Sequence, residues 1–397
     1  MPGPLEGYRI VDLTQLVSGP IATMILGDQG ADVIKVERPG EGDPTRGLGA
    51  ARGGMAPLFA TSNRSKRSLA LDLKEPRGLE LLRRLVAGAD VFVQNFRPGR
   101  AERLGLGEAA LRELRPDLVY VSISGFGETG PYAGKRVYDP VIQALSGLAS
   151  IQGDRVTGRP RMVRTILPDK LTALTAAQAI TAALLARERS GEGQHLRLAM
   201  LDAVVSFLWP EGMARYTFRR AEGPEGEGGA PRQVLDLVFE TADGFITCGT
   251  VADAEWRAFA RVVGHPEWAD DPRFATPAAR VANWDARLAR MQEALRARPT
   301  REWLELLDAA DVPCAPILGR RELLSHPQIL ANELIVESEH PHAGPMRETR
   351  PAARFSRTPA AIRRPAPLLG EHSAEVLAEI GVGPGELAEL RASGVVA

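Results

Sequence analysis

The chain has 397 residues, of which 44% are hydrophobic and 25% are charged, and its formal net charge is −1. This composition is typical of a soluble globular protein with two or three domains, and the near-neutral charge argues against a protein that binds nucleic acid or a membrane surface. No run of residues approaches the roughly 18 apolar positions that a membrane-spanning helix requires. The two cysteines, Cys248 and Cys314, are far apart in the sequence, so no disulfide framework is expected. Because the first residues do not form a signal peptide, we expect a cytoplasmic protein.

Short apolar runs alternate with helical patterns over the first 130 residues of the chain. Strands are predicted at residues 9–13, 31–37, 90–95 and 118–124, and the apolar spacing over 76–89 predicts a helix. Strands separated by helices of this length form parallel sheets through right-handed crossovers. The sequence therefore predicts an α/β fold whose large domain holds a Rossmann-like parallel sheet.

Changes in composition divide the chain into a large and a smaller domain. Residues 216–233 contain a stretch rich in Gly, Pro and Glu, which is typical of a linker. We assign residues 1–215 to the N-terminal part of the large domain and 234–330 to a small α+β domain. Residues 331–397 follow as a second linker with short strands and two helices.

A single carboxylate, Asp169, stands at the start of a long apolar helix predicted over residues 171–189. Pro168 favours the first turn of a helix, because its missing N–H would be unpaired there anyway. The positive end of the helix dipole stabilises a charged carboxylate, so we expect Asp169 to be ionised near neutral pH. Taken alone, an aspartate here is most often a helix cap. Since the sequence has no Gly-x-Ser-x-Gly elbow and no Walker lysine loop, Asp169 remains the best catalytic candidate.

Two sets of residues bear on nucleotide binding. Residues 125–130 spell the dinucleotide fingerprint, but Pro131 follows where the fingerprint must open a helix, so we interpret this segment as a loop. Polar and cationic residues also recur just past the predicted strands, among them Arg38, Asn95 and Arg103. Because the carboxyl ends of parallel strands line the ligand crevice, these residues favour a ligand that carries several phosphates.

Neither a zinc site nor a reactive thiol is predicted. His340 and His342 are the only close histidine pair, and they lack further ligands at metal spacing. Cys314 stands next to prolines without a nearby histidine, so we interpret it as a buried packing residue.

Motifs spread along the whole chain resemble those of one enzyme family, the class III CoA-transferases. This CaiB/BaiF-type family contains the formyl-CoA:oxalate and carnitine CoA-transferases and also α-methylacyl-CoA racemase. No single motif is decisive, but their order and spacing are specific. The segments that carry the resemblance are Pro4–Asp12, Gly30–Glu37, Asn63–Lys74, Asn95–Gly99, Gly191–Gln194 and Ala366–His372.

The resemblance implies a fold, a reaction and a set of site residues. The large domain would be completed by the C-terminal segment, and two chains would interlock as a homodimer. Asp169 would be the nucleophile that carries CoA as an aspartyl-CoA thioester between an acyl-CoA donor and a free carboxylic acid. CoA would be a substrate, and no metal or permanently bound cofactor would be needed. The implied CoA-binding positions are Val17, Ser18, Arg38, Leu71, Lys74, Asn95, Phe96, Arg97, Arg103, Arg136 and Tyr138.

The sequence departs from its relatives at positions that affect the substrate. Val17 stands where formyl-CoA transferase has a glutamine near the nucleophile, which disfavours the same substrate. Only Gly228 and Gly229 match the glycine loop that covers the site in that enzyme, so the role of this loop is in doubt.

Three functions stay open on the sequence: a CoA-transferase, a racemase and a non-catalytic CoA-binding relative. The racemase branch has a His-Asp pair where this chain has Tyr138 and Asp139. A racemase needs an acid and a base on opposite faces of the α-carbon, so the missing histidine favours the transferase. The acceptor acid is not specified: Arg161 and Arg164 either contact a second carboxylate or are surface charges.

Overall fold

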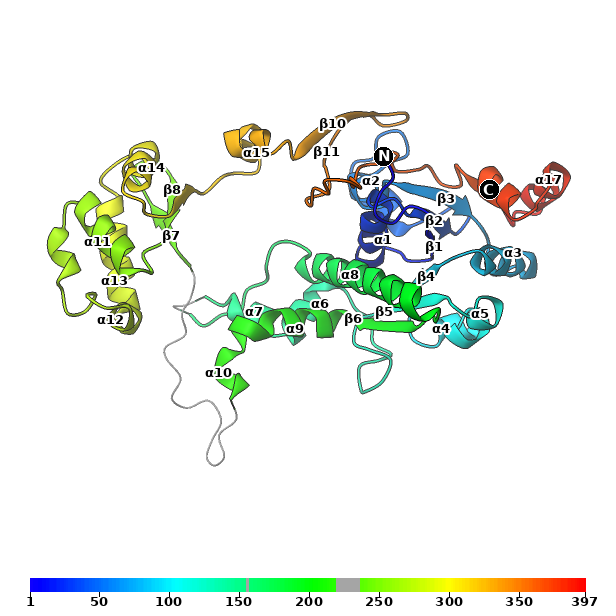
Figure 1. Ribbon diagram of the computed structural model, residues 1–397, viewed down its shortest axis with the longest axis horizontal. Coiled ribbons are helices and arrows are strands. Elements are labelled where there is room, and N and C mark those ends of the chain that lie inside the picture. The colour runs from blue at the N-terminus through cyan, green and yellow to red at the C-terminus, as the bar shows by residue number, and fades with distance from the viewer. Residues whose placement is uncertain (155–156, 219–235) are drawn as a thin grey trace. The chain divides into compact units, whose positions relative to one another are not determined.

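The computed structural model describes residues 1–154, 157–218 and 236–397, and these form two compact units (Figure 1). Unit 1 combines Met1–Met213 with Glu333–Ala397, and unit 2 is Ala214–Asn332. Most of the predicted linker at 216–233, including Gly228 and Gly229, lies outside the described residues.

A six-stranded sheet forms the centre of unit 1, in the order β3-β2-β1-β4-β5-β6. Every neighbouring pair of its strands is parallel, which confirms the predicted α/β fold with a parallel sheet. The strand order reverses between β1 and β4, and open α/β sheets bind ligands at the carboxyl ends beside such a reversal. The strands are β1 (Arg9–Asp12), β2 (Asp32–Glu37), β3 (Lys66–Ala70), β4 (Val91–Gln94), β5 (Val119–Ser124) and β6 (His195–Ala199).

Two of these strands, β3 and β6, are additions to the four that the sequence predicted. Strand β3 begins with Lys66 and Arg67, and β6 contains His195 and Arg197. Charged and polar side chains interrupt the apolar pattern that identifies a buried strand. In β3 these side chains are nevertheless buried, because they pair with groups from distant parts of the chain.

Helices cover both faces of this sheet (Figure 1). Ile10 of β1 packs in a core with α1 and α8, whereas its neighbour Val11 packs in a core with α3, α5, α16 and α17. This alternation follows from the opposite directions of successive side chains along a strand. The helices of unit 1 are α1 (Ser18–Asp28), α2 (Pro57–Asn63), α3 (Pro76–Ala87), α4 (Arg100–Arg103), α5 (Glu108–Leu114), α6 (Asp139–Leu145), α7 (Leu148–Ile151), α8 (Leu167–Ser190), α9 (Met200–Gly212), α16 (Ser373–Glu379) and α17 (Pro384–Ala392).

The C-terminal segment packs against the N-terminal sheet. The backbone N–H of Ala70, at the end of β3, donates to Ser373 Oγ over 3.2 Å, and the N–H of Asp72 donates to the Val395 carbonyl over 2.8 Å. Leu71 forms an isolated β-bridge with Val396. The two ends of the chain therefore share one core.

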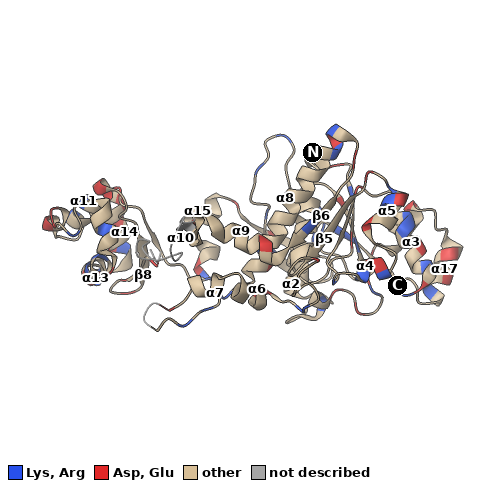
Figure 2. Cartoon of the chain, turned by 90° about the horizontal axis from the view of Figure 1, so that it is seen from below, with Lys and Arg blue, Asp and Glu red and all other residues tan. Residues whose placement is uncertain are grey.

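Helix α8 begins at Leu167, four residues earlier than predicted, so Asp169 lies within its first turn. Its buried face is made largely of small residues, among them Ala173, Ala176 and Ala177, which pack in one core with residues of α1. The helix ends at Gly191, which takes a φ of 74°. Figure 2 shows Lys, Arg, Asp and Glu gathered on α3, α5 and α17, whereas α8 and α9 carry charges only near their ends.

Unit 2 is built on a small antiparallel sheet in the order β7-β8-β9. Its core is rich in aromatic side chains, including Trp256, Trp268, Phe274 and Trp303. The elements of unit 2 are β7 (Val238–Glu240), β8 (Phe245–Cys248), β9 (Cys314–Pro316), α10 (Ala214–Thr217), α11 (Asp253–Val262), α12 (Pro277–Ala282), α13 (Trp284–Leu295), α14 (Thr300–Ala309) and α15 (Pro327–Ala331). Three 3-10 helices (Pro44–Gly47, Pro266–Ala269 and Glu322–Ser325) and the hairpin of β10 (Ile335–His340) with β11 (Gly344–Thr349) complete the described elements.

The helices and the two cysteines can be compared with what the composition predicted. Within the described ranges, every helix is too short or too polar to cross a membrane. Cys248 and Cys314 are free thiols that lie opposite each other on β8 and β9. Cys314 packs against the unit 2 core but is only partly buried, which corrects the prediction that it is a buried residue.

Candidate functional site

The β1–α1 loop, residues 13–17, joins the central strand β1 to helix α1. A Cβ atom at Gly19 would lie 2.3 Å from Thr14 Cβ, so glycine is required for α1 to begin this close to the loop. Leu16 has a φ of 69°, in the left-handed region that a leucine rarely adopts. Ser18, the first residue of α1, is only 5% exposed. The local structure is therefore a tight, strained turn that fixes the N-terminus of α1.

Asp169 lies beside this N-terminus, half-buried in the first turn of α8. The hydroxyl and the backbone N–H of Ser18 both act on the Asp169 carboxylate and lower its pKa, so Ser18 lies close to it. Residues of α1 and α8 share one core, and the N–H of Ser18 at the start of α1 lies close to this carboxylate. Groups of this kind stabilise negative charge, both on a carboxylate and on an oxyanion formed beside it.

The pKa of Asp169 is raised to about 6. Burial is the largest cause, because it disfavours the charged form, and the negative charge of Asp139 is the second. The hydrogen bonds from Ser18 act in the opposite direction and lower the pKa. At this pKa Asp169 is mostly ionised at pH 7 but becomes protonated only slightly below it. Burial and Asp139 therefore outweigh the helix dipole, which we expected to favour the charged form.

Asp139 is a site residue that sequence reasoning missed. It is 4% exposed at the start of α6, where its Oδ2 accepts a 3.4 Å hydrogen bond from the Asp169 backbone N–H. Its Oδ1 accepts a 2.6 Å bond from Gln143 Nε2. The signal that could have found it is the His-Asp pair of the racemase branch, which aligns with Tyr138 and Asp139, although that pair does not point to a residue 30 positions later.

The residues that the resemblance assigned to CoA follow the carboxyl ends of successive strands. Val17 and Ser18 follow β1, Arg38 follows β2, and Leu71 and Lys74 follow β3. The others follow β4 and β5: Asn95, Phe96, Arg97 and Arg103 after β4, and Arg136 and Tyr138 after β5. All of these residues therefore lie on segments that leave the carboxyl ends of strands of one sheet.

The side chains at this edge differ in what they offer a ligand. Lys74, Arg97, Arg103 and Arg136 are exposed, and so is Tyr138. They form a set of cationic and aromatic groups that solvent can reach.

The remaining residues that the resemblance assigned to CoA are in contact with other parts of the protein. Arg38 pairs with Glu41 over 3.0 Å. The side chain of Leu71 is buried in the core, and its backbone N–H donates to the Glu37 carbonyl over 2.8 Å. Val17 is likewise buried. Asn95 uses both ends of its amide on Gln15, accepting from its N–H over 2.9 Å and donating to its carbonyl over 2.8 Å.

A small cavity of about 170 Å³ adjoins this edge. Phe96 and Arg97 contribute to its wall, together with Gln94 and Ser122 from the ends of β4 and β5. Ser122 Oγ lies 2.7 Å from His195 Nε2, so a polar chain runs from the cavity into the sheet.

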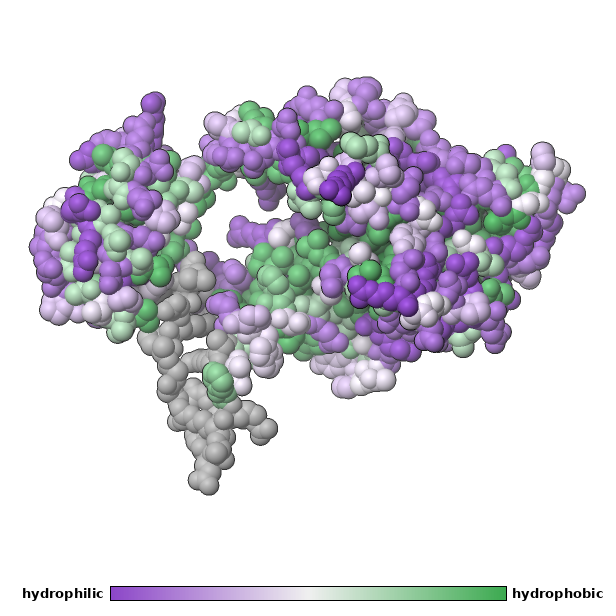
Figure 3. Space-filling view, viewed as in Figure 1, coloured by the Kyte–Doolittle hydropathy of each residue, from purple (hydrophilic) through white to green (hydrophobic). Residues whose placement is uncertain are grey.

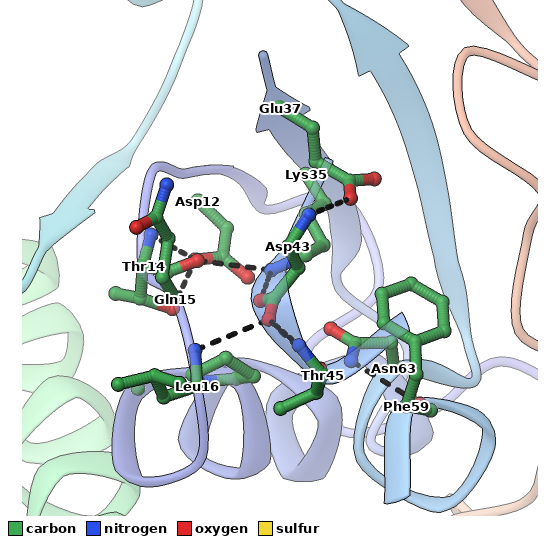
Figure 4. Close-up of polar contacts among 12 residues, drawn as sticks. Asp12, Thr14, Gln15, Leu16, Lys35, Glu37, Asp43, Thr45, Phe59 and Asn63 are labelled. Atoms are coloured by element: carbon green, nitrogen blue, oxygen red, sulfur yellow. Dashed lines mark hydrogen bonds and ion pairs between the residues drawn. The ribbon is translucent and has the colours of Figure 1, made fainter. Parts of the chain in front are cut away.

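A network of buried charges lies beneath the β1–α1 loop (Figure 4). Lys66 Nζ contacts Asp12 Oδ2 at 3.0 Å, and Lys35 Nζ contacts Asp43 Oδ2 at 2.9 Å, with all four side chains fully buried. Burial works to raise the pKa of Asp12, but Lys66 and Lys35 outweigh it and the pKa falls to about 2. The sequence signal was present but unused: Lys35 and Lys66 stand inside strands, where a lysine needs a buried partner.

The histidine considered as a zinc ligand and one arginine considered for the acceptor carboxylate bond to groups of the protein itself. His340 Nδ1 accepts from the N–H groups of His342 and Ala343, and its Nε2 lies 2.9 Å from the Ala366 carbonyl. Arg161 pairs with Asp154. Over residues 1–154, 157–218 and 236–397, no three His, Cys, Asp or Glu side chains cluster at metal-binding distance.

Comparisons with protein families, with curated proteins and with solved structures all point to one family. A model of CoA-transferase family III matches residues 5–373. The chain is 36% identical to the human succinyl-CoA:glutarate CoA-transferase, over 99% of this chain and 90% of that one. It is 39% identical to the succinate–glutarate CoA-transferase of Agrobacterium fabrum, over 95% and 96% of the two chains. Among solved structures, a CaiB/BaiF family protein from Brucella suis superposes with a TM-score of 0.81 and 33% identity, covering 96% of this chain and all of that one.

Proposed function

Because the chain belongs to CoA-transferase family III, we propose that it moves CoA from succinyl-CoA or a similar donor to a free dicarboxylic acid, through an aspartyl-CoA thioester on Asp169. The observation that carries this proposal is the half-buried carboxylate of Asp169 in the first turn of α8, whose backbone N–H bonds to the buried Asp139 and whose pKa responds to Ser18 at the start of α1. The names of the two relatives support the donor and acceptor classes.

The first half of the reaction transfers CoA to the enzyme. The Asp169 carboxylate attacks the thioester carbonyl, and the tetrahedral oxyanion collapses to a mixed anhydride as the CoA thiolate leaves. The thiolate then attacks the aspartyl carbonyl, the donor acid leaves as a carboxylate, and CoA remains as a thioester on Asp169. Two easier steps replace one difficult exchange and retain the energy of the thioester.

The second half uses the same two steps for the acceptor. Its carboxylate attacks the aspartyl-CoA carbonyl and expels the CoA thiolate, which leaves a second anhydride. The thiolate attacks the acceptor's acyl carbon, and Asp169 departs as a carboxylate. The donors of Ser18 lie where they can stabilise both Asp169 and the oxyanions beside it.

The environment of Asp169 suits a nucleophile that works near neutral pH. A carboxylate with a pKa of about 6 is more basic than an ordinary aspartate, yet it is still mostly ionised at pH 7. Since only the ionised form attacks, we expect the rate to fall as the pH drops through 6.

The exposed cations at the carboxyl edge support binding of the CoA phosphates. Lys74, Arg97, Arg103 and Arg136 follow three different strands and are exposed to a polyphosphate ligand. Binding that depends on these charges should weaken as salt rises. Phe96 and Tyr138 offer apolar surface to the rest of the ligand.

Trapping the covalent intermediate tests the proposal directly. The protein is mixed with succinyl-CoA without an acceptor, quenched and digested, and the mass of the peptide that contains Asp169 is measured. We expect it to carry the mass of CoA, and Asp169→Asn should give no adduct. If an enzyme that transfers CoA to glutarate forms no adduct after rapid quenching, the aspartyl-CoA route is wrong.

The racemase remains the second candidate, because that branch shares the scaffold. The charged group that acts on Asp169 here is the carboxylate of Asp139 and not an imidazole, which leaves the second proton-transfer group of a racemase unassigned. Wash-in of deuterium at the α-carbon of a 2-methylacyl-CoA measures racemisation. Wash-in without any CoA transfer would favour the racemase.

We also propose that two copies of the chain associate, as the resemblance implies. An apolar surface lies over α8 and α9 in unit 1, where Leu174 and Phe207 are 59% and 57% exposed (Figure 3). Apolar surface of this kind often marks a contact between chains. Sedimentation at low protein concentration tests this, and a monomer that still transfers CoA would contradict it.

A further inference from the structure

The backbone of the β1–α1 loop is held almost entirely by side chains from other segments. The Thr14 N–H donates to Asp12 Oδ1 over 2.8 Å, and the Thr14 carbonyl accepts from Lys35 Nζ over 2.9 Å. Both backbone groups of Gln15 bond to the amide of Asn95. The Leu16 N–H donates to Asp43 Oδ1 over 3.3 Å. These bonds hold the three middle residues of the loop, and Figure 4 shows the contact between Leu16 and Asp43.

Leu16 is the point in this loop where the backbone is strained. Its φ of 69° is unfavourable for a residue with a branched side chain and persists only where the surroundings enforce it. Asp43 supplies that restraint: its Oδ1 accepts the Leu16 N–H, and its Oδ2 is held by Lys35 Nζ at 2.9 Å. The N–H and hydroxyl of Thr45 hold the same Oδ1 from the other side.

Two residues after Leu16, the chain enters α1 at Ser18, whose hydroxyl and N–H lower the pKa of Asp169. The direction of the Ser18 hydroxyl and N–H therefore depends on the conformation of Leu16. We propose that Asp43 is a positioning residue of the transferase site, which acts through the Leu16 backbone to aim Ser18 at Asp169. The proposal rests on the proposed function of Asp169, and Asp43 itself touches neither Asp169 nor the reacting atoms.

The test compares two buried carboxylates that bracket α1. Asp43→Asn leaves one oxygen where two are needed, so Lys35 and the Leu16 N–H can no longer both be satisfied. Asp28→Asn is the matched control, because Asp28 is a buried carboxylate at the far end of α1, paired with Arg64 at 2.8 Å. Both substitutions break a buried ion pair, so both should lower the melting temperature.

Only Asp43→Asn should change the titration of Asp169. The Ser18 hydrogen bonds lower the pKa of Asp169. Their loss should therefore shift the acid limb, the fall of kcat/KM on the acidic side of its pH profile, to higher pH. The shift should be about one pH unit if a hydrogen bond to a charged group is lost. The charged group that also acts on Asp169, Asp139 on α6, is unchanged in both variants. The kcat should fall more than the KM for acyl-CoA changes. A wild-type acid limb in folded, active Asp43→Asn, or an equal shift in Asp28→Asn, would overturn the proposal.

A rescue experiment tests the path through Leu16. Glycine adopts a φ of 69° without steric cost, so Leu16→Gly should restore much of the acid limb and kcat of Asp43→Asn. If it restores neither, Asp43 does not act through this backbone. Should Asp43→Asn fail to fold, Lys35→Met with Asp43→Leu removes both buried charges together, which proteins tolerate better. That double variant must show the same upward shift, and a wild-type limb would contradict the proposal.

Failure of this inference can be told apart from failure of the proposed function. If the wild-type protein transfers no CoA, the proposed function is wrong, but carbon NMR of aspartate-labelled protein still titrates Asp169 without turnover. If it transfers CoA and Asp43→Asn leaves the Asp169 titration unchanged, only the positioning role fails.

Discussion

The two units bury different kinds of side chain. Beneath the β1–α1 loop, unit 1 encloses Lys35, Lys66, Asp12 and Asp43 without exposing any of them to solvent. Unit 2 instead stacks aromatic rings around Trp256 and uses its indole N–H on the Trp268 carbonyl over 3.1 Å. Buried ions contribute little net stability compared with apolar packing, but they fix geometry when every charge is paired. Unit 1 thus encloses a network of paired charges beside the β1–α1 loop, in addition to its buried Asp28–Arg64 pair. The core of unit 2 is mainly aromatic and apolar, although unit 2 also buries Arg280 and Arg287.

Asp169→Asn should show the largest effect on activity. The amide is isosteric but cannot attack a thioester, so we expect CoA transfer to fall by about a thousandfold or more. The measurement is the rate of succinyl-CoA consumption with glutarate, with circular dichroism to show that the fold is kept. Turnover within about tenfold of wild type by folded protein would remove Asp169 from the nucleophile position.

Trp256→Ala should show the largest effect on stability. Removing a large, fully buried ring from an aromatic core costs about 3–5 kcal/mol of the free energy of unfolding. Hydrogen exchange should rise over residues 253–316 of unit 2, while the acid limb of the remaining CoA transfer stays at the wild-type pH. A shifted acid limb would mean that the core of unit 2 affects the titration of Asp169 in unit 1.

The sequence predicted the apolar part of unit 1 better than its charged part. Runs such as Val33 and Ile34 in β2 alternate with helices, and this pattern needs no knowledge of distant residues. Strand β3 escaped prediction, because the charge of the buried Lys66 is balanced by Asp12, which lies 54 positions away. Whether a lysine in a strand is buried depends on partners that only the folded chain brings together.

The same limit applies to the candidate site. The sequence predicted the helix α8 and placed Asp169 close to its start, but it set that start four residues too late. The two groups that set its pKa besides burial, Asp139 and Ser18, come from the starts of other helices. Ser18 was named only through a family resemblance, and Asp139 was not proposed as an active-site residue.

The pH dependence of stability should differ in sign between a carboxylate of each unit. The folded protein raises the pKa of Asp169 to about 6, so its ionised form destabilises the fold above that pH, and this cost vanishes below the ordinary value of 3.8. Asp169→Asn should therefore raise the melting temperature at pH 8, with a gain that shrinks as the pH falls. In unit 2, hydrogen bonds from Arg273 lower the pKa of Asp271, so Asp271→Asn should lower the melting temperature at pH 8. Equal signs for the two variants in thermal melts would contradict the contrast between the units.

Asp139→Asn should produce the smallest change, a shift of the acid limb opposite to that of Asp43→Asn. The negative charge of Asp139 raises the pKa of Asp169, so its removal should lower that pKa and move the acid limb of kcat/KM to lower pH. The amide oxygen of the substituted side chain can still accept from the Asp169 N–H, which keeps the first turn of α8 in place. Asp117→Asn is the control, since Asp117 pairs with Arg115 at 2.6 Å and is not among the groups that act on Asp169. At about pH 5.5, below the pKa of Asp169, the Asp139→Asn enzyme should keep a larger fraction of its neutral-pH rate than the wild type does. Asp117→Asn should keep the same fraction as the wild type. An unchanged limb in Asp139→Asn would leave burial as the main reason that Asp169 titrates near neutral pH, and an upward shift would mean that Asp139 chiefly orients the nucleophile.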